Sequence, residues 1–398
     1  MNRKQFFSHL GAMGATMLAT PVINASPPEV FHLPLSVPPE APGKKIRVGV
    51  IGCGSVSGMY LPHLSKCPYA EIVSLCDIIP ERAQQAAAGY NVKNWYPHID
   101  KMLAGVPFDL LVNLTDMQEH GRLNRLALMA KKNIWSEKPM ANTYEEGRAL
   151  SDLATKQGVR IWGAPAVVNS PQFAFMAKQI NEHKLGKLAA AHAHYGHQGP
   201  NWSAFFFEEG GGSLPDLGVY NISTLTGLFG PVRSVIAMTN VVEPTRNTGN
   251  KGYIQVIAED NAMILMEHPN QVLSHVQCGF NYFDPYGHEG TGQALPTLSV
   301  TGSTGSMHMI GYDWKPSAIE MATVDDEKGR RYATDPGTFV WEEGASVICE
   351  CLATNKEPLI HVEHALHVLE IIEAARLSQA EGRRIRLKSS FKWPVIHS

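Results

Sequence analysis

Residues 46–58 read Ile46-Arg-Val-Gly-Val-Ile-Gly-Cys-Gly-Ser-Val-Ser-Gly58, an apolar run that ends in a glycine-rich turn. The apolar run predicts a buried strand, and the residues that follow it suit a helix. Gly52 permits a tight turn, and Gly54 lets the backbone approach a ligand closely. A strand, a glycine turn and a helix in this order are typical of a site that binds a pyrophosphate at the helix N-terminus, beside Ser55 and Val56.

The next acidic residue indicates which nucleotide this turn serves. Residues 71–76 form a second predicted strand, and Asp77 follows it directly. A carboxylate at that strand end accepts hydrogen bonds from the adenosine ribose hydroxyls and repels a 2′-phosphate. We therefore expect NAD, which can be bound tightly, although the nearby Arg82 leaves NADP open. Ser57 stands where the usual pattern has a third glycine, and its small side chain still allows close helix–strand packing.

The alternation of strands and helices continues through the first half of the chain. Predicted strands at 108–113, 133–135 and 159–162 alternate with predicted helices at 118–131 and 143–157. The second of these helices opens with a threonine suited to an N-cap. This pattern predicts a doubly wound parallel sheet, an α/β Rossmann domain that spans residues 44–165.

The second half of the chain has a different periodicity. Its strands are predicted at 187–195, 232–241, 253–258, 262–267 and 271–279 with short connections, and a helix is predicted at 362–380. Such a run predicts an α+β domain with a largely antiparallel open sheet over residues 166–398. The open face of such a sheet can pack against a partner.

Composition excludes several classes of function. The 398 residues carry 34 Lys and Arg against 37 Asp and Glu, a formal charge of -3, which argues against a nucleic-acid binder that depends on bulk electrostatics. A hydrophobic content of 44% with 18% charged residues excludes a disordered chain. The six cysteines are too few and too scattered for a disulfide framework.

The first 43 residues are not expected to belong to the fold. Arg3 and Lys4 precede a short apolar stretch at 10–19, and Ala25 follows, which is the order of an export signal. The apolar stretch is about half the ~20 residues that a membrane-spanning helix needs. We expect a twin-arginine-like export signal with Lys4 in place of the second arginine, and hence a periplasmic protein. A frayed N-terminus on a cytoplasmic protein is the alternative. Residues 26–43 are proline-rich and predict an extended linker.

A lysine follows the strand at 133–135, in the sequence Ser136-Glu-Lys-Pro139. The carboxyl end of a strand in such a sheet faces the cleft in which a nicotinamide would lie. Lys138 in that position, partly removed from water, can hydrogen-bond a substrate hydroxyl or move its proton. Pro139 follows it and can sit after a cis bond that fixes where the lysine points.

With this motif the chain resembles the Gfo/Idh/MocA family of NAD(P)-dependent oxidoreductases. The resemblance covers most of residues 44–398 and includes a second motif, Gly210-Gly-Gly-Ser-Leu-Pro-Asp216-Leu-Gly218-Val-Tyr220. It also includes Asn113 and His120 ahead of the Glu137-Lys138-Pro139 turn.

The resemblance implies roles for these residues. Lys138, Asp216 and Tyr220 are the implied catalytic set, and Asn113, His120, Glu137 and Lys138 itself join the cofactor-binding residues. The resemblance also implies that the second domain binds the substrate and forms a homo-oligomer through its sheet. Tyr220 stands where many members have histidine, as in the glucose–fructose oxidoreductase-like subgroup. A tyrosine becomes a base near neutral pH only if a cation lowers its pKa, and we expect Lys138 to supply that charge. Asp216, four residues before Tyr220, would orient it on one helix face.

Polar and aromatic residues in the second half are candidates for substrate contact. His192 and His194 share one face of the predicted strand at 187–195, and His197 and Trp202 come shortly after it. A zinc ion would need a third ligand and supporting partners, so no metal is expected. His194 and Trp202 are the candidate sugar-binding residues, although each could equally belong to the packing of the core.

Three functions remain open at this point. The first is a dehydrogenase that moves a hydride between a nicotinamide cofactor and a hydroxyl-bearing carbon of a sugar or polyol. The second is an NAD-dependent glycoside hydrolase that oxidises its sugar transiently and then eliminates the aglycone. The third, a sugar-binding protein with a purely structural cofactor, is disfavoured because Lys138 and Tyr220 are both present.

Overall fold

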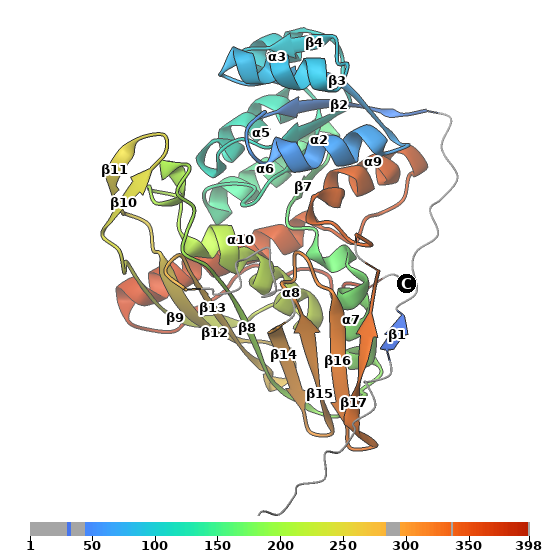
Figure 1. Cartoon of the computed structure of the whole chain (residues 1–398), viewed down its shortest axis with the longest axis vertical. Helices are drawn as coiled ribbons and strands as arrows, with labels where there is room; N and C mark the ends of the chain where they lie inside the picture. The colour runs from blue at the N-terminus through green and yellow to red at the C-terminus, as the bar shows by residue number, and fades with distance from the viewer. Residues whose placement is uncertain (1–29, 33–43, 284–294, 336, 397–398) are drawn as a thin grey trace, which may run out of the picture.

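A computed structural model describes residues 30–32, 44–283, 295–335 and 337–396 of the chain. It contains two large sheets with helices between and around them (Figure 1). The predicted export signal lies outside the described residues.

The first sheet is fully parallel, which confirms the predicted Rossmann architecture. Its strand order is β4-β3-β2-β5-β6-β7. The strands are β2 (Ile46–Ile51), β3 (Ala70–Cys76), β4 (Asn94–Tyr96), β5 (Leu110–Asn113), β6 (Asn133–Ser136) and β7 (Ile161–Gly163). The helices that connect them are α2 (Ser57–Lys66), α3 (Pro80–Gly89), α4 (Ile99–Ala104), α5 (His120–Met129) and α6 (Tyr144–Gln157).

Local signals explain where these elements begin and end. The Thr143 side chain accepts a hydrogen bond from the backbone N–H of Glu146 at 3.1 Å, so the predicted N-cap of α6 is confirmed. The same helix ends at Gly158, whose φ of 70° gives the left-handed C-cap that glycine adopts without strain. These caps fix the ends of the helix that follows the Glu137-Lys138-Pro139 turn.

The second sheet has ten strands in the order β1-β17-β16-β15-β14-β8-β13-β12-β9-β18. All neighbours are antiparallel except the pairs β8–β13 and β1–β17, so the sheet is largely antiparallel, as predicted. Its strands are β1 (Val30–His32), β8 (Leu188–Gly196), β9 (Ser234–Asn240), β12 (Asn261–Glu267), β13 (Leu273–Gly279), β14 (Pro296–Gly302), β15 (Gly305–Ile310), β16 (Ala318–Thr323), β17 (Asp326–Ala333) and β18 (Ile385–Arg386). A separate hairpin consists of β10 (Thr245–Thr248) and β11 (Gly252–Gln255).

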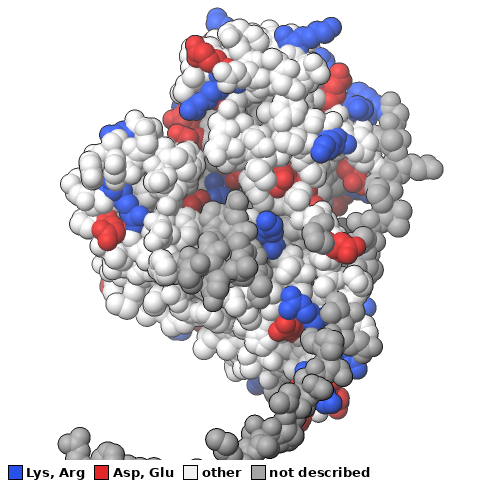
Figure 2. Space-filling view, in the orientation of Figure 1, with Lys and Arg blue, Asp and Glu red and all other residues white. Residues whose placement is uncertain are grey.

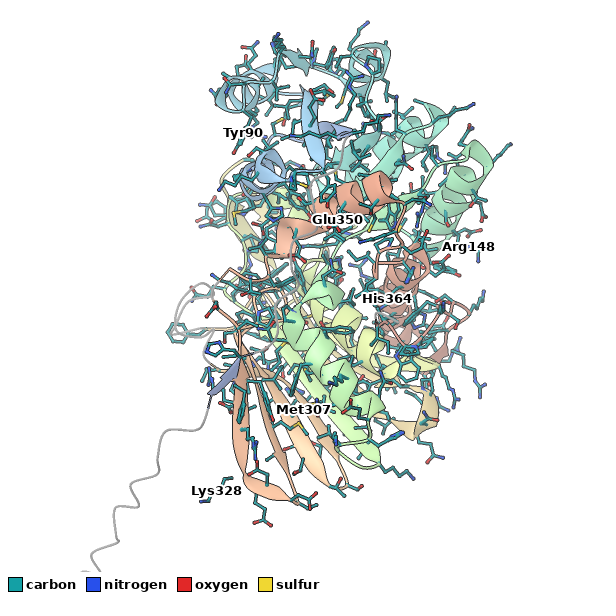
Figure 3. All side chains as sticks on the ribbon, turned by 90° about the vertical axis from the view of Figure 1, so that its right-hand side faces the viewer. Tyr90, Arg148, Met307, Lys328, Glu350 and His364 are labelled. Atoms are coloured by element: carbon teal, nitrogen blue, oxygen red, sulfur yellow. The ribbon has the colours of Figure 1, made fainter. Side chains whose placement is uncertain are left out.

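One face of this sheet is covered by helices and the other is open. The remaining helices are α7 (Pro171–Asn181), α8 (Val219–Phe229), α9 (Gly344–Thr354) and α10 (Val362–Glu381). Helix α10 packs on β9, α8 on β8 and β13, and α7 on β16. Figure 3 labels Met307 of β15, which is fully buried beneath the helices.

Helix α9 belongs to the second half of the sequence but packs on the first sheet. It contacts α2, β2, β3 and β6. It lies beside the N-terminal half in Figure 1, where it is labelled α9, and in Figure 3, where Glu350 marks it. Gly344 lies so close to the buried Trp135 indole that a Cβ would overlap it, and His63 Nδ1 lies 2.8 Å from Ser346 Oγ. The two halves therefore share one continuous apolar core.

The N-terminal boundary differs from the prediction. Residues 26–43 were expected to form a linker, yet Val30–His32 adds a parallel strand to the edge strand β17. The centre of the Phe31 ring lies 5.4 Å from that of the Tyr332 ring. This contact holds the segment against β17, and the proline-rich composition of residues 26–43 does not predict it.

The described surface carries mixed charge. Figure 2 shows Lys and Arg interspersed with Asp and Glu on the face that it presents, without a large patch of one sign. In the described part of the chain, no helix is both long and apolar enough to cross a bilayer.

Candidate active site

The glycine turn after β2 has the backbone that the sequence predicts. Gly52 has a φ of 90°, and a Cβ there would lie 2.6 Å from the carbonyl carbon and oxygen of Leu114. Its N–H donates to the carbonyl of Cys76 at 2.9 Å. Only glycine fits between β3 and the end of β5, so this turn depends on Gly52.

The space in front of the turn suits a pyrophosphate. A Cβ at Gly54 would meet only Arg82 Nη1, at 3.8 Å, so the backbone is open to a ligand and a cation lies close by. Ser57 Oγ donates to the Gly54 carbonyl at 2.6 Å, which shows what the serine does in place of the third glycine. Ser55 and Val56 immediately precede α2, where the positive end of the helix dipole favours a phosphate.

Asp77 lies at the end of β3, where the adenosine ribose is expected. One carboxylate oxygen accepts from Cys53 N at 2.7 Å and the other from Ile79 N at 2.8 Å. These bonds hold the carboxylate rigidly next to the turn, and each oxygen keeps a lone pair for a hydroxyl. The residues present therefore fit NAD.

Asn113 and His120 lie behind the site rather than in it. The Asn113 amide donates to Asn124 at 2.9 Å, and its oxygen accepts from Thr115 Oγ1 at 2.8 Å. The His120 ring nitrogens lie 2.7 Å from the Pro139 carbonyl and 2.9 Å from the Thr115 carbonyl. Burial lowers the pKa of His120. Both side chains position the ends of β5 and β6, a role that differs from the predicted contact with the cofactor.

Glu137 is held by a buried relay. The Trp135 indole N–H donates to Tyr60 Oη at 3.1 Å, and Tyr60 Oη donates to Glu137 Oε1 at 2.6 Å. The second carboxylate oxygen accepts from Lys138 N at 3.0 Å. Burial, and then the adjacent Glu137, raise the pKa of Tyr60 well above its usual value, so it stays a donor. This relay fixes the backbone from which Lys138 projects, and the Lys138–Pro139 bond is cis, as anticipated.

Lys138 reaches across to the second domain. Its Nζ donates to Asp216 Oδ1 at 2.6 Å and to the Asp216 carbonyl at 2.9 Å. It also lies 5.3 Å from the centre of the Tyr220 ring. The Lys138 and Asp216 side chains are 12% and 14% exposed, so the pair is shielded yet reachable from the cleft. The structure thus brings the three predicted catalytic residues together.

The net pKa shift of Tyr220 is opposite to the one that the predicted role as a base requires. Burial raises the pKa of Tyr220 well above its usual value, and Glu137, Asp216, Asp313 and Glu342 raise it further. Lys138 does not outweigh burial and these carboxylates, since its ammonium lies 2.6 Å from Asp216, which offsets its charge. Tyr220 is therefore a neutral phenol that can donate a hydrogen bond to a ligand.

Asp216 also has a different partner from the one expected. It lies in a π-helical turn, Leu214–Gly218, which leads into α8, and its carboxylate accepts from Lys138. Wide turns of this kind are frequent at functional sites. Here the turn presents both the carbonyl and the carboxylate of one residue to the same ammonium group.

The two predicted substrate-binding residues occupy different places. His194 lies on the open face of β8, and the centre of its ring is 5.8 Å from that of His192. The next residue is Tyr195, and the centre of its ring is 6.2 Å from that of Tyr220. Successive strand residues point to opposite faces, so His194 faces away from the site, and its prediction as a sugar ligand is wrong. Trp202 is 47% exposed on the loop after β8 and packs edge-on against Phe206.

Several residues near Tyr220 were not predicted. The rings of Tyr195 and Tyr312 lie 4.4 Å apart, and Tyr312 stacks near Trp314, which together make an aromatic wall. Asp313 accepts from Asn221 and Thr224 of α8, and burial raises its pKa to about 6. The alternation along β8 could have identified Tyr195 as a residue on the face opposite His194. Tyr312, Asp313 and Trp314 lie in the loop after β15, and no local sequence signal points to them.

A further unpredicted residue, Gln118, ties the two domains at the edge of the site. Its side-chain amide donates to the Phe205 and Glu209 carbonyls at 2.9 and 3.2 Å. Within the described ranges, no three His, Cys, Asp or Glu side chains converge as metal ligands.

Comparison with known proteins places this geometry in a family. Residues 46–164 match the description "Oxidoreductase family, NAD-binding Rossmann fold", and residues 173–308 match "GFO/IDH/MocA C-terminal domain". The chain belongs to the Gfo/Idh/MocA family. Its first half is the NAD-binding domain of an oxidoreductase.

Individual Gfo/Idh/MocA relatives are distant but cover most of the chain. D-apiose dehydrogenase of Paraburkholderia graminis is 26% identical, and the match spans 87% of this chain and 91% of the relative's length. Trans-1,2-dihydrobenzene-1,2-diol dehydrogenase of Mus musculus is 22% identical over 83% of this chain and 96% of its own. A solved structure, levoglucosan dehydrogenase with NADH and L-sorbose, has a TM-score of 0.76 at 18% identity, over 87% of this chain and all of that one.

The two glycines of the turn make separable predictions. Gly54→Ala is expected to weaken NAD binding at least about tenfold without lowering the melting temperature, because its Cβ meets no backbone but occupies the space for the phosphates. Gly52→Ala is expected to weaken binding and also to destabilise the fold by about 1–3 kcal/mol, because its Cβ would overlap the backbone of Leu114 and Thr115 just after β5. Calorimetric titration with NAD and thermal melts would measure both.

Gly58→Ala is the matched control. Gly58 lies in the first turn of α2, and a Cβ there would meet no atom within 4 Å. Unchanged NAD affinity in Gly54→Ala would contradict the placement of the phosphates.

Proposed function

We propose that the chain transfers a hydride between NAD and a hydroxyl-bearing carbon of a sugar or polyol. The observation that carries this is the Lys138–Asp216 contact of 2.6 Å, made between the carboxyl end of β6 and the start of α8, beside Tyr220. A cation, a carboxylate and a neutral phenol at one point can together hold a hydroxyl and exchange its proton.

Each residue has a separate part in this proposal. Bound NAD supplies the hydride acceptor or donor. Lys138 hydrogen-bonds the substrate oxygen and stabilises the negative charge that develops there. The hydroxyl proton passes to the Asp216 carboxylate during oxidation, and the neutral Tyr220 donates a hydrogen bond to the same oxygen. Holding the reacting groups in line contributes the larger share, up to roughly 7–11 kcal/mol.

The relatives support the substrate class. Apiose and levoglucosan, named for two of them, are sugars or sugar derivatives, and dihydrobenzenediol is a cyclic diol. The aromatic wall of Tyr195, Tyr312 and Trp314 beside Tyr220 suits the apolar face of such a ring.

A sugar and polyol panel tests the proposal. We expect a net change in nicotinamide absorbance with at least one uncharged sugar or polyol, and no release of aglycone from aryl glycosides. Cleavage without net absorbance change would identify the NAD-dependent glycosidase instead. Denaturing the purified protein beforehand shows whether NAD or NADP is already bound.

Substitutions at the site sharpen this test. Lys138→Ala is expected to lower kcat/KM by roughly 10²–10⁴, and Tyr220→Phe by roughly 10², with unchanged NAD affinity. Lys156→Ala, at an exposed position, serves as the control.

The raised pKa of Tyr220 makes a separate prediction about pH. Because the phenol stays protonated from pH 7 to 10, Tyr220→Phe should lower the pH–rate profile without changing its shape. If the pH–rate profile of the unaltered protein has a limb between pH 7 and 10, and Tyr220→Phe removes that limb, the phenol ionises in this range and the prediction is wrong.

We further propose that the protein is exported, on the strength of Arg3, Lys4 and the apolar stretch at 10–19. The full chain produced in a bacterium should appear, shortened, in the periplasmic fraction. A variant with Arg3→Gln and Lys4→Gln should remain cytoplasmic at full length. If the unaltered chain and the Arg3→Gln, Lys4→Gln variant are distributed equally between the periplasmic and cytoplasmic fractions, the proposed export is contradicted.

We also propose that the open face of the second sheet mediates self-association. Four large apolar side chains of β9 and β12, namely Ile236, Met238, Met263 and Leu265, are 44–77% exposed on it. Burying them against a second copy would remove this apolar area from water. Light scattering should give at least twice 43.6 kDa, and Met238→Glu with Leu265→Glu should lower the mass. A mass of one chain in the unaltered protein would refute the proposal.

A further inference from the structure

The consecutive glycines of the second motif admit a carboxylate from elsewhere in the chain. Residues 210–212 are all glycine, and they precede the π-helical turn Leu214–Gly218, which contains Asp216. A Cβ at Gly212 would lie 2.3 Å from Glu259 Oε1, and the φ of Gly212 is 115°. Gly212 therefore lets the Glu259 carboxylate approach the backbone just before the turn, which a residue with a side chain would prevent.

The Glu259 carboxylate caps the start of this turn. Its Oε1 accepts a hydrogen bond from the backbone N–H of Leu214 at 3.3 Å, and the carbonyl of Glu259 accepts one from Ser213 N at 2.8 Å. The first N–H groups of a helix have no partner within the helix, and the helix dipole favours a negative charge beside them. Because the turn continues directly into α8, Glu259 fixes the N-terminal end of the whole helical segment.

Arg376 of α10 orients the Glu259 carboxylate. Its Nε donates to Oε2 and its Nη2 to Oε1, each at 3.0 Å, and such a paired contact sets the direction of the carboxylate as well as balancing its charge. Nη2 also donates to the carbonyl of Gly211. The Glu259 side chain is 8% exposed and that of Arg376 is 33% exposed, so the pair is better shielded than an ordinary surface ion pair.

The turn that Glu259 caps carries both acceptors of Lys138. Asp216 follows Leu214 by two residues, and its carboxylate and its carbonyl both bond Lys138 Nζ. Because these two acceptors belong to one residue, a shift of the turn moves them together. A displacement of about 1 Å in an active site can lower the rate by about 10²-fold, so the position of this turn bears directly on the chemistry.

We propose that Glu259 and Arg376 are positioning residues, whose ion pair fixes the turn Leu214–Gly218 and thereby holds Asp216 at Lys138. This inference rests on the proposed function, because it gives the pair a part in the same hydride transfer. Both residues act through Asp216 and not on the substrate. The sequence did not predict the pair, since 117 residues separate its members.

Removing Arg376 and then supplying a guanidinium ion tests this proposal. In the full-length protein with NAD, Arg376→Ala is expected to lower kcat for the sugar or polyol by roughly 10- to 100-fold. NAD affinity should not change, because the first domain holds the cofactor. Guanidinium chloride, far below the concentrations that unfold the protein, should restore part of the lost kcat.

The rescue separates positioning from a purely structural role. Guanidinium is a denaturant, so it would lower the activity of a variant that is only less stable, and that result would overturn the proposal. Arg148→Ala is the matched control, because it removes an arginine that forms an exposed ion pair with Asp152 on α6, away from the turn (Figure 3). Its kcat should equal that of the unaltered chain, with and without guanidinium.

Glu259→Gln provides a second variant in case Arg376→Ala does not fold. The glutamine has the same size and keeps an acceptor oxygen for the N–H of Leu214, but it loses the charge that pairs with Arg376. We expect kcat to fall by about tenfold, with no rescue by guanidinium because Arg376 is still present.

Crystal structures of the unaltered chain and of Arg376→Ala distinguish this proposal from the proposed function. The Lys138–Asp216 contact of 2.6 Å is expected to lengthen beyond hydrogen-bond distance in the variant. If the unaltered chain oxidises no sugar or polyol but the contact lengthens, the proposed function fails while the positioning of Asp216 is supported. If the contact is unchanged in the variant, or if an active unaltered chain and the variant have equal kcat, the proposal is overturned.

Discussion

The arrangement of this enzyme depends on one ion pair between its two domains. Lys138 comes from the carboxyl end of a parallel sheet, and Asp216 comes from the turn before α8. A pair this shielded gains little net stability from its attraction, because both charges lose water, but removing one partner leaves the other charge buried and costs about 3–5 kcal/mol. Lys138 is therefore held in place by a contact that a substrate hydroxyl can replace, since the hydroxyl offers the ammonium the same kind of acceptor.

Holding that contact at 2.6 Å requires that the two domains keep a fixed relation. Helix α9 provides this, because it leaves the second domain and completes the core of the first sheet. The bond between His63 and Ser346 and the close approach of Gly344 to Trp135 lie on that surface. Trp135 also donates to Tyr60, which in turn holds Glu137. The packing that joins the domains thus continues directly into the turn that carries Lys138.

What the sequence could predict follows from how local each signal is. The Gly52 turn, the Thr143 cap and the order of strands and helices depend on residues close together in the chain, and all are present in the structure. Alternation along β8 showed that His192 and His194 share a face, but not which face meets the active site, and a shift of one residue separates His194 from Tyr195. The strand at Val30–His32 depends on a contact with Tyr332, about 300 residues later, which no local pattern records.

The electrostatic surroundings of Tyr220 were the least predictable part, because they come from four separate segments. Motif comparison identified Lys138, Asp216 and Tyr220, but the pKa of the phenol depends on every charge near it. Glu137, Asp216, Asp313 and Glu342 all act to raise it, and Lys138 is already paired with one of them. The carboxylates that keep Tyr220 neutral also oppose a further negative charge in the same place. We therefore expect the site to favour an uncharged polyol over a sugar acid, since an added carboxylate would face several like charges and only one cation that is already engaged.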